Sequence, residues 1–127
     1  MPTSFWKIST NTKTEEKCKK ILNKVKALLN QPAIEVTYEP HWDTKEFSGS
    51  FQLRSNSSSK EELMFELILL GQQIGYDWQL NGSIDRQTSA HSTRFMVSGI
   101  VFAEWHVDIP DEWLDLLRES KHKPLED

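Results

Sequence analysis

The segment 97–113, VSGIVFAEWHVDIPDEW, contains the side chains of this chain that are best placed for chemistry. His106 and Asp108 are two residues apart, a spacing that puts both on one face of a strand, as two metal ligands require. Further ligands would have to come from His41 and Asp43, which stand in a distant loop. Two ligands alone do not make a site, so we predict no bound metal. We interpret His106 as a histidine at the solvent-exposed end of a strand.

Paired carboxylates are a second source of possible chemistry, because two carboxyl groups in unlike environments can act as acid and base. Glu104 with Asp108, or Glu35 with Glu39, would form such a pair, but alternation with apolar neighbours explains Glu35 and Glu39 as a solvated strand face. Cys18 falls on the apolar stripe of a helix, which is typical of a core residue. GxSxG, HExxH and phosphate-binding glycine motifs are missing. We therefore predict no enzyme activity, no catalytic residue and no cofactor.

Recognition of a protein partner is better supported by the same segment. Between residues 104 and 115 there are five carboxylates and no lysine or arginine, with two tryptophans among them. Concentrated charge steers association, and tryptophan is enriched at binding hot spots. The residues predicted to bind a partner are Glu104, Trp105, Asp108, Asp111, Glu112, Trp113 and Asp115.

Composition indicates one folded domain over residues 1–127, with a flexible tail at 120–127. The chain is 37% hydrophobic and 27% charged, which excludes the signature of disorder. A single cysteine excludes an internal disulfide and favours a reducing compartment. The longest apolar run, four residues, is far below the roughly 20 of a membrane span, and no secretory signal is recognisable. We expect a cytoplasmic protein.

Charge is divided unevenly along the chain. Residues 1–30 hold seven lysines and two glutamates, a net +5, whereas the remainder holds eight basic and seventeen acidic residues, a net −9. Lysines on the first helix leave nucleic-acid binding as an alternative, although the acidic domain argues against it. A small-ligand or metal-binding, enzyme-like domain with a pocket lined by His41, His91 or His106 is another alternative.

Eight elements are predicted from periodicity. Thr12 and Glu15 have the spacing of a capping box ahead of an amphipathic helix, and Ser59 and Glu62 repeat it ahead of a helix apolar nearly all round, which should be the more deeply packed. Strands are predicted near 5–8, 34–38, 47–53, 78–84 and 95–107, with a polar connection at 85–92. Pro110 and the carboxylates after it indicate a short C-terminal helix.

These elements predict an α+β fold. A single antiparallel or mixed sheet of about five strands would have two long helices packed on it and a short C-terminal helix. The first six elements follow the ferredoxin-like order βαββαβ, extended by a strand and a helix.

The chain resembles the small immunity proteins of bacterial contact-dependent growth inhibition and related polymorphic-toxin systems. The resemblance is carried by size, acidic balance, missing catalytic motifs and the strand GIVFAEWHVDIP leading to a tryptophan-containing helix. It implies a tight complex with one cognate toxin, often a nuclease, whose active site or substrate surface is blocked. An acidic domain that occupies the basic cleft of such an enzyme is physically coherent with this expectation.

Overall fold

The computed structural model describes residues 2–83, 87–110 and 113. Its elements are, in chain order, β1 (Thr3–Thr10), α1 (Glu15–Leu29), β2 (Ala33–Pro40), β3 (Phe47–Arg54), α2 (Lys60–Ile74), β4 (Gly75–Tyr76), β5 (Gln79–Ser83), β6 (Gln87–Ser92), β7 (Arg94–Phe95) and β8 (Ile100–Asp108). The fold is α+β, as predicted. The predicted C-terminal helix and the tail at 120–127 lie outside the described residues, except for Trp113.

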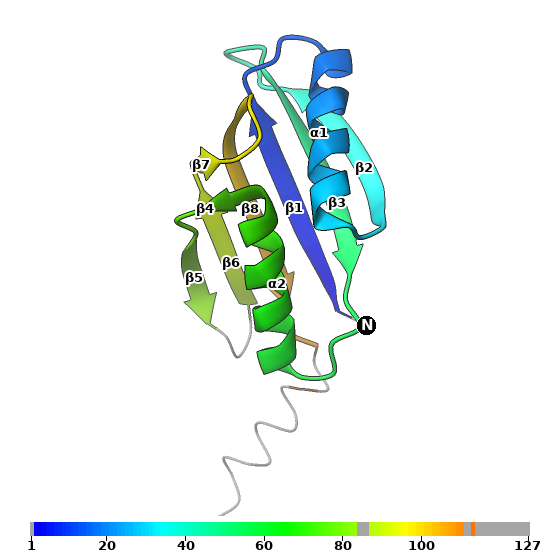
Figure 1. Ribbon diagram of the computed structural model, residues 1–127, viewed down its shortest axis with the longest axis vertical. Coiled ribbons are helices and arrows are strands. Elements are labelled where there is room, and N and C mark those ends of the chain that lie inside the picture. Colours follow the sequence, from blue (N-terminus) through cyan, green and yellow to red (C-terminus); the bar gives the residue numbers. More distant parts are fainter. Residues whose placement is uncertain (1, 84–86, 111–112, 114–127) are drawn as a thin grey trace, which may run out of the picture.

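The main sheet has six antiparallel strands in the order β2-β3-β1-β8-β6-β5, and β4 pairs with β7 in a small separate ladder. Both helices lie on one face of this sheet, with α1 over β2 and β3 and α2 over the other half (Figure 1). The prediction of about five strands was therefore short by one in the main sheet. The strand missed is β6, whose sequence QTSAHS is too polar to predict a strand, although Thr88, Ala90 and Ser92 are buried on it.

The topology corrects the expected extension of the ferredoxin-like order. Strands β1 and β2 are both antiparallel to β3, which lies between them, so β1, α1 and β2 form a split βαβ unit. The strand on the other side of β1 is the last one, β8, and the β5–β6 hairpin is inserted before it and lies outside it. The extra strands thus occupy one edge of the sheet, whereas the final strand is central.

Helix α1 begins two residues later than the pattern predicted. The side chain of Thr14 accepts a hydrogen bond from Lys17 N at 3.2 Å, whereas the Thr12 hydroxyl is 2.7 Å from that of Thr10. The helix ends at Asn30, which adopts a left-handed conformation with φ 53°. The Thr12 hydroxyl therefore contacts the end of β1, and Thr14 is the capping residue.

Helix α2 begins as predicted, with Ser59 Oγ accepting from Glu62 N at 3.2 Å. It has six buried residues against five in α1, which has the same length, but apolar side chains also lie on its outer side: Phe65 is 66% exposed, Leu69 43% and Ile68 36%. The reason is geometric. A helix about 10 Å wide covers about two strands at 4.8 Å spacing, so two helices on six strands form a single layer whose outer side faces solvent.

Strand β8 begins at Ile100, five residues after the predicted start. Phe95 instead pairs with Gly75 in the small β4–β7 ladder, and Gly99 turns the chain with φ 97°. Thr10 lies opposite Ile100 while Ser9 lies opposite Phe102, so one extra residue interrupts the alternation. Ile100 is consequently buried and Val101 is exposed.

Trp6 lies at the centre of the core between sheet and helices. Its ring is within 6.1–6.3 Å of the rings of Phe51, Trp78 and Trp105, measured between centroids. The indole N–H donates to Ser4 Oγ at 2.9 Å, so this buried donor is satisfied. These aromatic contacts fix the position of β1 relative to β8. They therefore also fix the positions of the side chains that these two strands carry on the opposite face of the sheet.

Candidate functional site

The face of the sheet away from the helices carries exposed and half-buried side chains from all six strands. Alternation on β1 buries Trp6 and Ile8 beneath the helices and directs Phe5 and Lys7 to the other side. Both helices cover the same face, so this second face carries no helical layer in the part of the chain described (Figure 1). We refer to it as the open face.

Strand register aligns polar side chains in one row across the open face. Lys7 pairs with Glu104, and Glu104 pairs with His91, so the carboxylate lies between two basic groups on neighbouring strands. Side chains directly opposite on antiparallel strands are about 5 Å apart at Cβ and interact. The full row, from β2 to β5, is Thr37, Ser50, Lys7, Glu104, His91 and Gln79.

A second row, next to the first, carries aromatic contacts. The rings of Phe5 and His106 stack with centroids 4.9 Å apart and an interplanar angle of 15°. On the other side of the first row, Phe102 stacks on His91 of that row at 5.8 Å, and His91 Nδ1 is 3.2 Å from Asn81 Nδ2. These contacts place two half-buried aromatic rings among polar groups on a rigid sheet.

A shallow hollow of about 370 Å³ lies on the open face between β2 and β8. Its polar lining includes Lys7, Glu35, Glu104 and His106, and its floor includes Phe5. Glu35 has φ 53° at an irregularity in the β2–β3 pairing, a left-handed conformation that is unfavourable for a side-chain-bearing residue. The irregular backbone brings the Glu35 side chain to this hollow.

The predicted partner-binding residues that the structure describes do not share one exposed surface. Glu104 and Asp108 are exposed on the open face, but Trp105, between them in sequence, is 1% exposed and faces the helices. Trp113 is half-buried and packs against the core. Asp111, Glu112 and Asp115 lie outside the described residues. The alternation of a strand separates the tryptophan at 105 from its acidic neighbours.

His106 and Asp108 share a face, as predicted from their spacing, and both are exposed. No group of three histidine, cysteine, aspartate or glutamate side chains suited to a metal occurs in the described ranges. His41 is in the β2–β3 connection, where its Nδ1 accepts from the backbone N–H of Asp43 at 3.2 Å and its ring stacks on Trp42. The hollow lined by His106 is lined by neither His41 nor His91.

Cys18 is fully buried, as expected of a core residue. Burial raises the pKa of its thiol, while hydrogen bonding to Thr10 and Thr12 works in the opposite direction. A thiol that is buried and protonated is a poor nucleophile.

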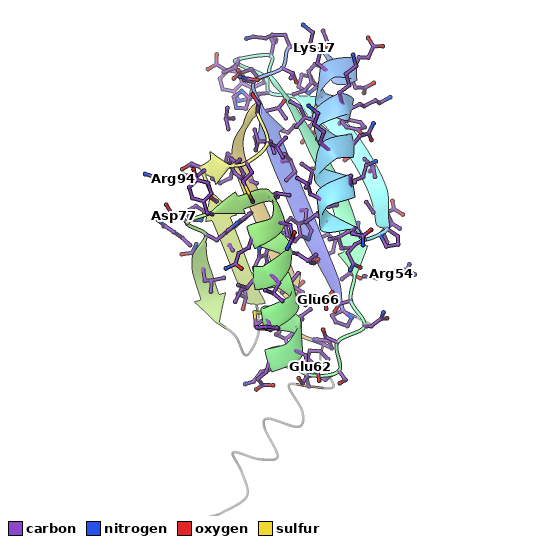
Figure 2. All side chains as sticks on the ribbon, in the orientation of Figure 1. Lys17, Arg54, Glu62, Glu66, Asp77 and Arg94 are labelled. Atoms are coloured by element: carbon purple, nitrogen blue, oxygen red, sulfur yellow. The ribbon has the colours of Figure 1, made fainter. Side chains whose placement is uncertain are left out.

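Lysines in α1 and in the segment just before it are partly engaged within the molecule. Lys13 Nζ donates to Thr44 O at 2.7 Å, and Lys19 Nζ is 3.7 Å from the Glu15 carboxylate and 5.6 Å from the Tyr38 ring centroid. Figure 2 shows the side chains over the whole described surface, with Lys17 near the start of α1.

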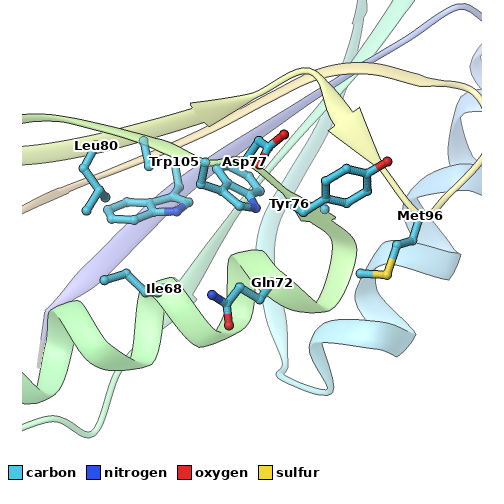
Figure 3. Close-up of a pocket in the computed structure, with 10 residues that line it drawn as sticks. Ile68, Gln72, Tyr76, Asp77, Leu80, Met96 and Trp105 are labelled. Atoms are coloured by element: carbon cyan, nitrogen blue, oxygen red, sulfur yellow. The ribbon is translucent and has the colours of Figure 1, made fainter.

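A second hollow, of about 560 Å³, lies on the helix side of the sheet beyond α2. Ile68 and Gln72 of α2 project toward it, opposite Leu80 and Trp105 (Figure 3). Asp77 at its rim forms an ion pair of 3.4 Å with Arg94 (Figure 2). This hollow is mainly apolar and contains none of the histidines.

Sequence reasoning missed the contribution of Phe5, Lys7, His91 and Phe102 to one surface. Each is unremarkable in its own segment, and only the register of β1, β8 and β6 brings them together. The signal available in the sequence was the alternation of side chains along a strand. It places Phe5 and Lys7 on the face of β1 opposite to the face that carries Trp6.

Comparisons with protein-family models, with curated proteins and with solved structures found no significant match. No helix in the described part of the chain has the length and apolar character needed to cross a membrane.

Proposed function

We propose that this chain is a non-enzymatic immunity protein that binds and neutralises a cognate toxin, a nuclease with a basic substrate surface. The proposal rests on one observation: Glu104 and Asp108 are exposed on a central strand of a sheet face that carries aromatic rings as well as charge. A sheet face of this kind is rigid, so little conformational entropy is lost when a partner binds.

The charge on the open face favours a basic partner. Four of its carboxylates are Glu35, Glu39, Glu104 and Asp108, and its lysine and arginine side chains among the described residues are Lys7 and Arg54. Negative surfaces accelerate association with positive ones and reject negative ones. A nuclease must present a basic cleft to its substrate, and such a cleft complements this surface.

The anchors in this proposal are Phe5 and Phe102, in place of Trp105 and Trp113. Both rings are half-buried on the open face and are held by the stacked imidazoles of His106 and His91. Aromatic residues, phenylalanine among them, are enriched at the cores of protein interfaces. Trp105 supports the surface from beneath, through its contact with Trp6.

The test is affinity capture from the source-cell lysate at low and at physiological salt, followed by assay of the captured protein's activity. We expect one stoichiometric basic protein at both salts and loss of its toxic activity when the complex forms. The double variant Glu104→Gln/Asp108→Asn should slow association roughly tenfold and weaken its salt dependence. Glu16→Gln/Glu61→Gln, which removes two exposed carboxylates from the helices, is the matched control and should leave association unchanged.

Two outcomes would contradict the proposal. Equal loss of association in both double variants would mean that overall charge, and not the open face, controls binding. Capture of nucleic acid alone, only at low salt, would support the alternative interface on the lysines of α1.

A small polar ligand in the 370 Å³ hollow is the second candidate function. Lys7, Glu35, Glu104 and His106 converge on it, which is the kind of lining that orients a charged small molecule. Native mass spectrometry of the purified protein distinguishes this function: a bound small molecule lost in Glu35→Gln would support it, and a bare chain would not.

A further inference from the structure

The two edges of the six-stranded sheet differ in how they are protected. An edge strand exposes unpaired backbone N–H and C=O groups, and proteins usually block such an edge with charge, proline or a bulge. Strand β2 forms one edge and β5 the other. The difference between them indicates which edge accepts another strand.

The β2 edge is blocked in three ways. The pairing of β2 with β3 is irregular between Ile34 and Thr37, and Glu35 within that interval has φ 53°. The strand carries two carboxylates, at Glu35 and Glu39, and ends in Pro40. A second strand pairing there would meet a distorted backbone, like charges and a missing N–H.

The β5 edge lacks the charge and the proline of β2, and although Gly82 has φ 92°, its pairing with β6 continues in register from Gln79 to Ser83. Its sequence, QLNGS, contains no charged residue and no proline. Leu80 is 54% exposed on the helix side, where the apolar hollow next to α2 continues toward Ile68 and Tyr76 (Figure 3). Uncharged backbone beside exposed apolar side chains favours pairing with another strand.

The β5 sequence is complementary to itself in antiparallel pairing. If Asn81 lies opposite Asn81 of a second copy, Leu80 of each chain lies opposite Gly82 of the other. Leu80 and Gly82 share one face of the strand, so the bulky side chain meets a position without a Cβ. No like charges face each other in this register.

We propose that two copies of this chain associate through antiparallel β5–β5 pairing, which joins their sheets into one continuous sheet. The association is isologous and stops at two copies, because the β2 edges at both ends of the joined sheet are blocked. The open faces of both copies remain accessible to a partner in this dimer. Dimerisation and the proposed toxin binding therefore use different surfaces, and each can be tested independently of the other.

Sedimentation velocity over a wide concentration range measures the dimer directly. We expect wild-type protein to change from the chain mass to twice that mass as concentration rises. Asn81→Lys and Asn81→Glu each place like charges opposite one another at the two-fold axis and should weaken dimerisation roughly tenfold, about 1.4 kcal/mol. Asn81 is exposed, so both variants should keep the wild-type circular dichroism spectrum.

Mixing the two variants is the decisive experiment. Asn81→Lys and Asn81→Glu together should form a heterodimer, identified by its mass in native mass spectrometry, with affinity at least that of wild type. Thr37→Lys and Thr37→Glu, exposed substitutions on the β2 edge, are the controls and should leave the dimer intact. Wild-type protein that stays monomeric at all concentrations, or a dimer sensitive to Thr37 and not to Asn81, would overturn the proposal.

Discussion

Phe5 of β1 and His106 of β8 stack at 4.9 Å on the open face, directly behind Trp6 and Trp105, which contact each other in the core at 6.3 Å. Neighbouring residues on the same two strands therefore form an aromatic contact on each face of the sheet. The inner pair belongs to the core, and the outer pair holds a ring at the surface proposed to bind a partner.

The outer stack should contribute measurably to stability. In a double-mutant cycle of Phe5→Ala and His106→Ala, we expect a coupling free energy of about 0.5–1 kcal/mol, the range for stacked ring pairs and cross-strand neighbours. Urea unfolding of the four proteins measures it. Phe5→Ala with Ser50→Ala, two side chains without a ring contact, is the matched cycle and should show coupling near zero.

Gly49 allows α1 to pack closely on β3. A Cβ at this position would lie 2.6 Å from Leu22 Cγ, too close for either group to remain in place. We predict that Gly49→Ala destabilises the fold by about 1–3 kcal/mol through overpacking. In a Leu22→Ala background, Gly49→Ala should reduce the free energy of unfolding by much less than it does in the wild-type protein. Equal losses in the two backgrounds would contradict the predicted clash.

The N-terminus of α1 provides a test of its capping residue. Thr14→Ala removes the acceptor for Lys17 N and should cost about 1 kcal/mol of stability, whereas Thr14→Asp should restore most of it. Thermal unfolding followed by circular dichroism at 222 nm, a helix-sensitive wavelength, compares the three proteins. Full stability of Thr14→Ala would mean that another residue caps this helix.

Glu62 links stability to pH. The backbone N–H of Ser58, and then its hydroxyl, donate to the Glu62 carboxylate and lower its pKa below 4.5. Since the folded-state pKa is the lower one, the contribution of Glu62 is complete above its unfolded-state pKa and is lost as the pH falls through the folded-state value. Glu62→Gln should therefore reduce the loss of stability on acidification below about pH 4.5. Urea midpoints measured from pH 6 to pH 3 check this, with Glu61→Gln as the control.

Local patterns in the sequence were sufficient for several elements. The apolar stripe of Cys18, Ile21, Leu22, Val25 and Leu29 defines the buried side of α1, and Ser59 with Glu62 defines the start of α2. These predictions hold because helix periodicity and capping depend on residues within one or two turns of each other. Strands β2 and β3 and the exposed end of β8 follow in the same way from alternation.

Only the tertiary structure decided the strand order, the β6 strand and the composition of the open face. Polar β6 forms a strand because β8 and β5 supply hydrogen-bond partners on both sides, a contribution no local pattern contains. Phe5, Lys7, Glu104 and His91 meet because β1, β8 and β6 are neighbours, although they are up to about a hundred residues apart in the chain. The sequence by itself determined the helices and the faces of individual strands, since those depend on local periodicity. The surface on which function is proposed depends on register between distant strands, and that register is set by packing of the whole core.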